Sequence, residues 1–241
     1  MLAHISLAAP FDTSCPSSLS FCRCNFDWRQ NCEASFERYG VQCPAQAANW
    51  STRRRAEYLA GRYCAIKALS ALPHSNGASG AMQLPIRDDC SPQWPPGTVG
   101  SISHSQHQAI AITARDSDFS GLGIDCETLL TDSAAAEIAP WVLQPNDLNC
   151  KIEVPLSYGF LITLIFSAKE SLFKALAPRH KNILDFGHLS DTFFVSKVTA
   201  KTLILHTDMT LNQELQSNTQ FQLSYTVDQQ QIITMALLTR N

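Results

Sequence analysis

The sequence predicts an α+β fold built from two halves with a similar order of elements. In each half a long helical segment is accompanied by a group of short strands. The order helix, strands, strand, helix, strands looks like one α+β unit used twice, although no internal sequence repeat accompanies it. The 241 residues, 45% of them hydrophobic, allow either one large domain or two small ones.

The chain is expected to fall into three parts. Residues 1–50 have little periodicity, with Cys, Ser, Asn and Pro scattered through them, and predict an irregular segment packed on the first half. One strand is expected there, near Leu19–Cys24. Residues 51–118 are then the first α+β half, and residues 119–241 the second.

The first half is predicted to begin with a helix. Ser51 or Thr52 can cap it, and it should end near Ala71, before Pro73. Apolar residues recur in it at helical spacing, at Ala56, Leu59, Ala60, Tyr63, Ile66 and Leu69. Residues 73–98 contain five prolines and three glycines, which indicates a long ordered loop.

The remaining elements follow from runs of apolar residues. Strands are expected at Val99–Ser103, Ala109–Ala114 and Leu122–Cys126, then a short helix at 134–142. A strong helix is predicted at Tyr158–Leu176, closed by Pro178. Four alternating runs predict a mostly antiparallel sheet, at 192–198, 201–207, 219–227 and 231–238.

The charge of the chain is concentrated rather than spread. Charged residues make up 16% and the formal net charge is −3, so no global field favours nucleic acid. Within fifteen residues, however, lie five basic side chains: Arg53, Arg54, Arg55, Arg62 and Lys67. The N-terminus lacks the basic start of a secretory signal, and no apolar run is long enough to span a bilayer. We expect a cytoplasmic protein without a transmembrane segment.

The nine cysteines show no repeated spacing and no C-x-x-C pair. Their odd number and the position of two of them in predicted core elements favour reduced thiols that act as small hydrophobes. A zinc site would be the alternative, although the paired spacing of structural zinc sites is missing. Its ligands would be Cys15, Cys22, Cys24 and Cys32.

Asp125 and Glu127 stand two apart at the end of a predicted strand. Side chains at this spacing share one face, so both carboxylates point the same way while Cys126 points back. Two adjacent carboxylates repel each other unless a cation lies between them, and magnesium takes oxygen ligands of this kind. On geometry alone, a pair of solvated acids where a strand meets a loop remains open.

Two further segments carry polar residues that are weak signals by themselves. In the segment from Phe166 to Leu176, Glu170 and Lys174 are four apart and share one helical face, as in an ordinary surface ion pair. In the segment from Val99 to Ser105, a glycine, three serines and a histidine at a strand end can donate hydrogen bonds to a phosphate.

Taken together and in this order, the segments resemble the 4'-phosphopantetheinyl transferases, and most of all the enterobactin-synthase component D branch, close to the surfactin-type enzymes. The resemblance runs from about Arg53 to the C-terminus. The segments that carry it begin with Arg55-Ala-Glu-Tyr-Leu-Ala-Gly-Arg62 and Trp94-Pro-Pro-Gly-Thr-Val-Gly-Ser-Ile-Ser-His104, and continue with Gly123-Ile-Asp-Cys-Glu127 and Phe166-Ser-Ala-Lys-Glu-Ser171 with Lys174.

The resemblance implies a pseudo-two-fold pair of α+β subdomains with coenzyme A in the cleft between them. By the same resemblance, Asp125, Glu127 and Glu170 would hold Mg²⁺, with Glu170 and Lys174 also acting in catalysis. The remaining implied contacts are to the phosphates of coenzyme A, through Arg55, Arg62, Arg87, Ser103 and His104. Arg53 is a further candidate. The branch usually has isoleucine where this chain has Cys126, a position that faces away from the metal.

The activity that the resemblance implies is transfer of 4'-phosphopantetheine from coenzyme A to a serine of an apo carrier protein, with release of 3',5'-ADP. The carrier would belong to a siderophore synthetase of the enterobactin kind, with fatty-acid or polyketide carriers as the alternative. The enzyme would be a monomer, although a dimer stays open. Association with a synthetase complex at the inner membrane stays open. For the carrier we expect an apolar docking patch, with Trp141, Leu143 and Leu148 as candidates. Two alternatives are a non-catalytic coenzyme A or nucleotide-binding module and a metal-dependent phosphodiesterase.

Overall fold

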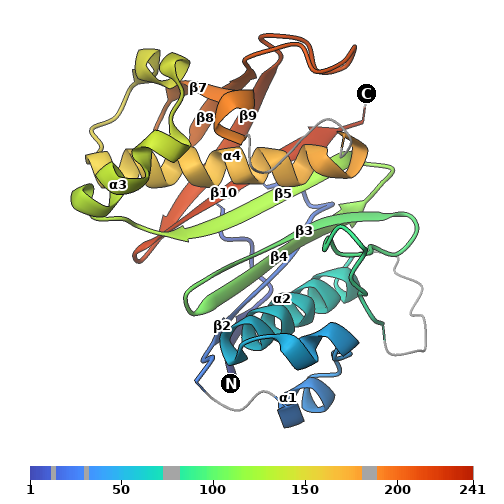
Figure 1. The fold of residues 1–241 in the computed structure, drawn as a ribbon. Coiled ribbons are helices and arrows are strands. Elements are labelled where there is room, and N and C mark those ends of the chain that lie inside the picture. Colours follow the sequence, from blue (N-terminus) through green and yellow to red (C-terminus); the bar gives the residue numbers. More distant parts are fainter. Residues whose placement is uncertain (12–14, 30–32, 73–81, 181–188, 241) are drawn as a thin grey trace. The chain divides into compact units, whose positions relative to one another are not determined.

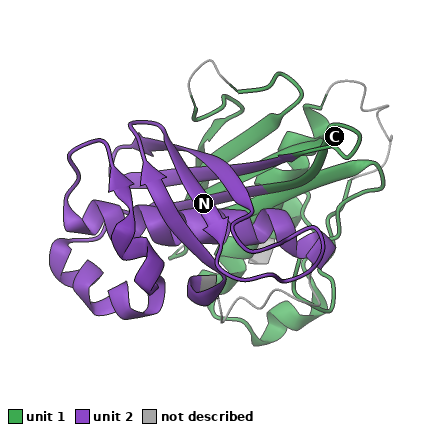
Figure 2. Ribbon diagram, turned by 90° about the horizontal axis from the view of Figure 1, so that it is seen from above, with its two compact units in different colours: residues 1–122, 239–241 green, residues 123–238 purple. Residues whose placement is uncertain are grey.

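The computed structural model describes residues 1–11, 15–29, 33–72, 82–180 and 189–240. The chain divides into two compact units, the first made of Met1–Leu122 with Thr239–Asn241 and the second of Gly123–Leu238 (Figure 2). Each unit contains helices and a β-sheet, so the predicted α+β class is confirmed. In the described residues, no helix combines the length and apolar character needed to cross a membrane.

The first unit is a four-stranded antiparallel sheet in the order β1-β2-β4-β3, with helix α2 (Thr52–Ser70) packed on one face (Figure 1). Ser51 caps this helix by accepting a hydrogen bond from the Arg54 amide at 3.2 Å, as predicted. Leu59 and Cys64 are fully buried on the side facing the sheet. The strands are β1 (Leu2–Ser6), β2 (Ser20–Phe26), β3 (Thr98–Ser105) and β4 (Gln108–Arg115).

The N-terminal segment is more regular than its sequence suggests. The expected strand near Leu19–Cys24 is present as β2, but β1 was not predicted, nor were α1 (Glu33–Arg38) and the 3₁₀ turn η1 (Ala45–Asn49). Strand β1 lies at the sheet edge and pairs with β2 through a register shift. Its side chains are therefore mostly exposed and show no alternation that the sequence could reveal. Of the loop predicted at 73–98, residues 73–81 lie outside the described residues.

The second unit is a six-stranded sheet in the order β5-β10-β9-β8-β7-β6 with helices packed against it (Figure 1). All four strands predicted in the C-terminal third are present. The strands are β5 (Phe119–Thr128), β6 (Lys151–Ile152), β7 (Phe193–Val198), β8 (Thr202–Thr207), β9 (Gln220–Asp228) and β10 (Gln231–Thr239). The helices are α3 (Asp132–Val142), η2 (Pro145–Asn149), α4 (Tyr158–His180) and α5 (Leu189–Thr192).

Helix α4 is the main core element of the second unit, and it is longer than predicted. The expected end at Leu176 before Pro178 is wrong, because the helix continues to His180 with the proline inside its last turn. A proline removes only one backbone hydrogen bond there. Leu176 and His180 are both buried, so packing holds the last turn in place.

At Gly123, the backbone of β5 lies in close contact with the backbone of α4. A Cβ atom at this position would overlap the carbonyl oxygen of Ser171 and come within 3.0 Å of the Ala175 amide nitrogen. Because both neighbours are helix backbone, neither can move aside like a flexible side chain. Only glycine therefore lets β5 approach α4 this closely.

We expect Gly123→Ala to destabilise the protein by about 3 kcal/mol or more, the upper range for overpacking a core. The measurement is urea unfolding followed by circular dichroism. Gly40→Ala is the control, because a Cβ there meets nothing and only the positive φ of 66° is strained, at a cost of about 1–2 kcal/mol. A Gly123→Ala variant as stable as the control would contradict the close packing.

Candidate active site

Two carboxylates, those of Asp125 and Glu170, contact the ammonium group of Lys174 between β5 and α4 in the second unit, and Glu127 lies near enough to be affected by their charge. Asp125 and Glu127 lie on one face of β5, as their spacing predicted, and Asp125 is only 1% exposed. Glu170 and Lys174 project from α4, one helical turn apart. The acidic and basic residues predicted from separate segments are thus brought together.

Lys174 connects the strand to the helix. Its Nζ donates a hydrogen bond to Asp125 Oδ1 at 2.6 Å and forms an ion pair with Glu170 Oε2 at 3.3 Å. The sequence suggested only an i,i+4 surface pair between Glu170 and Lys174. In the structure the lysine is instead shared between two poorly exposed carboxylates, and their charge raises its pKa above the usual range despite its burial.

The carboxylates hold more negative charge than one lysine neutralises. Burial, with Asp125 and Glu170 nearby, raises the pKa of Glu127 to about 8. Burial and Asp125 likewise raise the pKa of Glu170 to about 7, and Lys174 offsets only part of this rise. The protein alone therefore resists full ionisation of the cluster, and an added cation would favour it.

The donor set suits magnesium, which prefers carboxylate oxygens and a negatively charged site. Within the described residues, no three Asp, Glu, His or Cys side chains converge as a ready metal-binding group. Instead, the ammonium group of Lys174 contacts Asp125 and Glu170. Asp125, Glu127 and Glu170 thus fit a magnesium ion in charge and donor type.

The first unit contains a basic cluster around Glu57 on α2. Arg53 Nε lies 2.8 Å from Glu57 Oε1, and Arg54 Nη1 lies 4.0 Å from Oε2. His104 Nε2 on β3 is 3.9 Å from the same oxygen. Sequence reasoning missed Glu57, although its position four residues after Arg53 was a visible signal. One acid thus gathers two arginines and the predicted histidine.

Ser103 and His104 are not brought together by their side chains. Neighbouring residues of a strand point to opposite faces of the sheet. Ile102 contacts the position of Gly61 on α2, so His104, two residues on, faces this helix while Ser103 faces away from it. Ser103 is 5% exposed. The two side chains that were predicted to bind one phosphate therefore lie on opposite faces of the sheet.

The three predicted arginines lie in different settings. Arg55 holds η1 to α2, since its Nε donates to Ala47 O at 2.8 Å and its Nη2 to Ala48 O at 3.0 Å. Arg62 is only 6% exposed, stacks on Tyr58 with 4.8 Å to the ring centroid, and has no hydrogen-bond partner for Nε in the described chain. Arg87 is exposed, in a turn closed by its amide and Ser91 O.

Half of the eight cysteines that the structure describes are core residues. Cys22, Cys24 and Cys64 are buried between β2 and α2, and Cys64 donates its thiol hydrogen to Cys24 Sγ at 3.4 Å. Cys15 lies elsewhere, beside Ser17 and Leu19 in a separate pocket. The fourth ligand of the zinc alternative, Cys32, lies outside the described residues.

Two segments of the chain match known families of proteins. Residues 121–236 match the 4'-phosphopantetheinyl transferase superfamily, and residues 43–114 match the 4'-phosphopantetheinyl transferase N-terminal domain. The chain belongs to the 4'-phosphopantetheinyl transferase superfamily. The first matched part contains Glu57, Arg62 and His104, and the second contains Asp125, Glu127, Glu170 and Lys174.

Among curated relatives of this superfamily member, enterobactin synthase component D of Salmonella typhi is 35% identical over 128 residues, 53% of this chain and 50% of the relative. The same protein of Escherichia coli K12 is 33% identical over 132 residues, covering 54% and 59%. 4'-Phosphopantetheinyl transferase Svp of Streptomyces mobaraensis is 32% identical over 154 residues, covering 59% and 56%. The aligned part spans only about half the length of these relatives.

Three apolar residues of the second unit, Trp141, Leu143 and Leu148, were predicted to lie on the surface as a docking patch. Trp141 at the end of α3 is 81% exposed and Leu148 in η2 is 77% exposed. Leu143 is different, since it is half-buried and packs against the core of the second unit. Two of the three predicted residues therefore stand on the surface, in the unit that carries Glu170.

We expect Lys174→Met to lower the stability by about 3 kcal/mol, because removing one partner of a buried ion pair typically costs roughly 3–5 kcal/mol and Lys174 is partly exposed. Urea unfolding measures the change. Lys197→Met is the control, since it breaks a surface pair with Glu153 at 3.2 Å, worth about 0–1 kcal/mol. Added Mg²⁺ should stabilise Lys174→Met more than the unsubstituted protein. Equal stabilisation of both would contradict a cation site at these carboxylates.

Proposed function

We propose that this protein transfers the 4'-phosphopantetheine group of coenzyme A to a serine of an apo carrier protein and releases 3',5'-ADP. The observation that carries the proposal is the cluster of Asp125, Glu127, Glu170 and Lys174, which the matched superfamily segment encloses. A purely binding module would need no buried acid beside a lysine. A phosphodiesterase would need a further group to activate water.

Magnesium held by Asp125, Glu127 and Glu170 would supply neutralisation of charge on the pyrophosphate of coenzyme A. Glu170 takes the proton of the carrier serine, since a carboxylate beside the metal site can act as a general base. The serine oxygen forms a bond to the β-phosphorus, and the bond from that phosphorus to the bridging oxygen breaks. Lys174 stabilises the charge that the leaving 3',5'-ADP acquires.

The basic residues of the first unit would bind the phosphates that do not react. Arg62 is the strongest of them, since a buried guanidinium without an acidic partner in the described residues favours an anion. It lines a pocket of about 190 Å³ with Tyr58 and Gln83. His104, with Arg53, and Arg87 would add charge. Ser103 is left out of this proposal, because its side chain lies on the opposite face of the sheet from His104. Arg55 would act mainly by holding η1.

The carrier is proposed to be a domain of a nonribosomal peptide synthetase for a siderophore. The support is the name of the relatives called enterobactin synthase component D. Others are named only as phosphopantetheinyl transferases, so acyl carriers are the alternative. The exposed Trp141 and Leu148 would form its docking surface, because a folded substrate domain needs apolar contact area.

The reaction is tested by incubating the purified protein with coenzyme A, Mg²⁺ and an apo peptidyl carrier domain, followed by intact mass spectrometry of the carrier. We expect the carrier to gain one phosphopantetheine group, and chelation of the metal to prevent the gain. Binding of coenzyme A without transfer to peptidyl, aryl or acyl carriers would favour a binding module. Hydrolysis of coenzyme A without transfer would favour a phosphodiesterase.

Glu170→Gln should lower kcat by about 10²–10⁴, the contribution typical of a general base, because an amide cannot accept the serine proton. Coenzyme A should still bind, as isothermal titration calorimetry can show. Glu153→Gln is the matched control, since Glu153 is a surface partner of Lys151 and Lys197 and should leave turnover unchanged. Turnover of Glu170→Gln near that of the control would exclude this residue as the base.

A further inference from the structure

A second ion pair in the second unit lies directly beside the proposed base. Lys169, which precedes Glu170 on α4, has its Nζ 2.7 Å from Asp147 Oδ2 in η2. The side chains of Lys169 and Asp147 are 3% and 0% exposed, respectively. Despite its place in the motif that carries Glu170, Lys169 is therefore too buried to contact a substrate. Its role must be exerted through the residues it binds.

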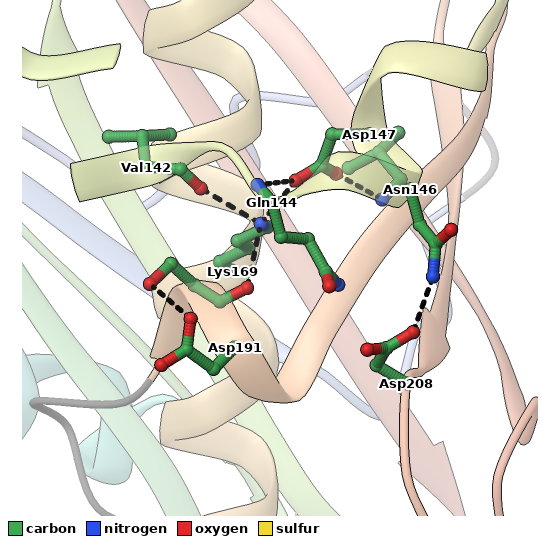
Figure 3. A network of polar contacts seen from close by, with 9 residues as sticks. Val142, Gln144, Asn146, Asp147, Lys169, Asp191 and Asp208 are labelled. Carbon is green, nitrogen blue, oxygen red and sulfur yellow. Dashed lines mark hydrogen bonds and ion pairs between the residues drawn. The ribbon is translucent and has the colours of Figure 1, made fainter. Parts of the chain in front are cut away.

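Backbone groups form further hydrogen bonds with both members of the Lys169–Asp147 pair. Besides Asp147, Lys169 Nζ donates to Val142 O at 2.9 Å and lies 3.5 Å from Ser190 O. Asp147 accepts from the Gln144 amide at 2.9 Å and from the Val195 amide at 2.6 Å. The two charges thus join α4 to the end of α3, to η2 and to β7 (Figure 3).

These anchored positions adjoin the exposed apolar residues. Val142, whose carbonyl Lys169 binds, directly follows Trp141, and Asp147 directly precedes Leu148. The residue beside each exposed side chain is therefore held by the same ammonium group, Val142 through its carbonyl and Asp147 through its carboxylate. That group belongs to the residue next to Glu170, so one buried network connects the apolar surface with the helix of the proposed base.

We propose that Lys169 and Asp147 are positioning residues, which hold the Trp141–Leu148 surface at a fixed place relative to Glu170, so that a docked carrier protein presents its serine to this base. The inference rests on the proposed transferase function. Directional hydrogen bonds define one arrangement of the 142–147 segment, whereas apolar packing alone would tolerate several. Because coenzyme A is not expected to touch this surface, the pair should act on the carrier and leave coenzyme A binding unchanged.

The test compares Lys169→Met, Asp147→Asn and Trp141→Ala, together with the Lys169→Met/Trp141→Ala double variant. KM for the apo peptidyl carrier and for coenzyme A are measured separately, with Mg²⁺ saturating. Tyr225→Phe is the control, because it removes an internal hydrogen bond to Thr199 O in the same unit without touching the docking surface. Its two KM values should match those of the unsubstituted protein.

We expect each single variant to raise KM for the carrier about tenfold or more, since a misplacement of about 1 Å can lower activity by about 100-fold. KM for coenzyme A should stay within about twofold. The double variant should be no worse than the poorer single variant, because both changes remove the same interaction.

Three results would overturn the proposal. The first is an unchanged KM for the carrier in both Lys169→Met and Asp147→Asn. The second is a parallel loss of coenzyme A affinity or effects that multiply in the double variant, which would show a role independent of the docking surface. The third is failure of both pair variants to fold, which would show that the pair serves folding. Failure of the proposed function is distinct, since the unsubstituted protein would then transfer nothing.

Discussion

The proposed chemistry depends on one close approach, that of β5 to α4 in the second unit. Gly123 lets the strand backbone lie against the carbonyl of Ser171, and only at this separation can Lys174 reach Asp125 at 2.6 Å. A buried hydroxyl network holds the same helix to the neighbouring strand of the sheet, where Ser167 and Ser171 bond to Thr234 on β10. The helix is therefore fixed to two adjacent strands, and the carboxylates stand on the helix and strand surfaces that meet.

This approach also explains the electrostatic state of the cluster. Packing of the backbone removes water from Asp125 and partly from Glu170, and burial raises the pKa of Glu127 and Glu170 for that reason first. Lys174, four residues after Glu170 on α4, offsets part of the rise in the pKa of Glu170. One lysine does not neutralise all three carboxylates. The cluster therefore has more negative than positive charge, and a cation that arrives with the substrate would balance it.

Much of the site could be predicted from the sequence because its residues follow local periodicity. Asp125 and Glu127 share a face by the two-residue repeat of a strand, and Glu170 and Lys174 by the four-residue repeat of a helix. The same rule separates Ser103 from His104, which the resemblance had grouped. The edge strand β1 shows no alternation of burial, and Pro178 is tolerated because tertiary packing outweighs its local effect. Such features arise from contacts distant in sequence.

The partner of Lys169 shows most clearly what local patterns omit. A lysine beside a predicted catalytic glutamate suggests a role at the substrate, yet its ammonium points into the core toward Asp147, 22 residues earlier. A buried charge is costly unless its donors are used, and here Lys169 Nζ lies within 3.5 Å of three acceptors, Asp147 Oδ2, Val142 O and Ser190 O. The sequence thus places two lysines and one glutamate within six residues of one helix, while the fold gives the two lysines different roles. Lys174 serves the reacting groups, and Lys169 holds the surface to which the protein substrate would bind.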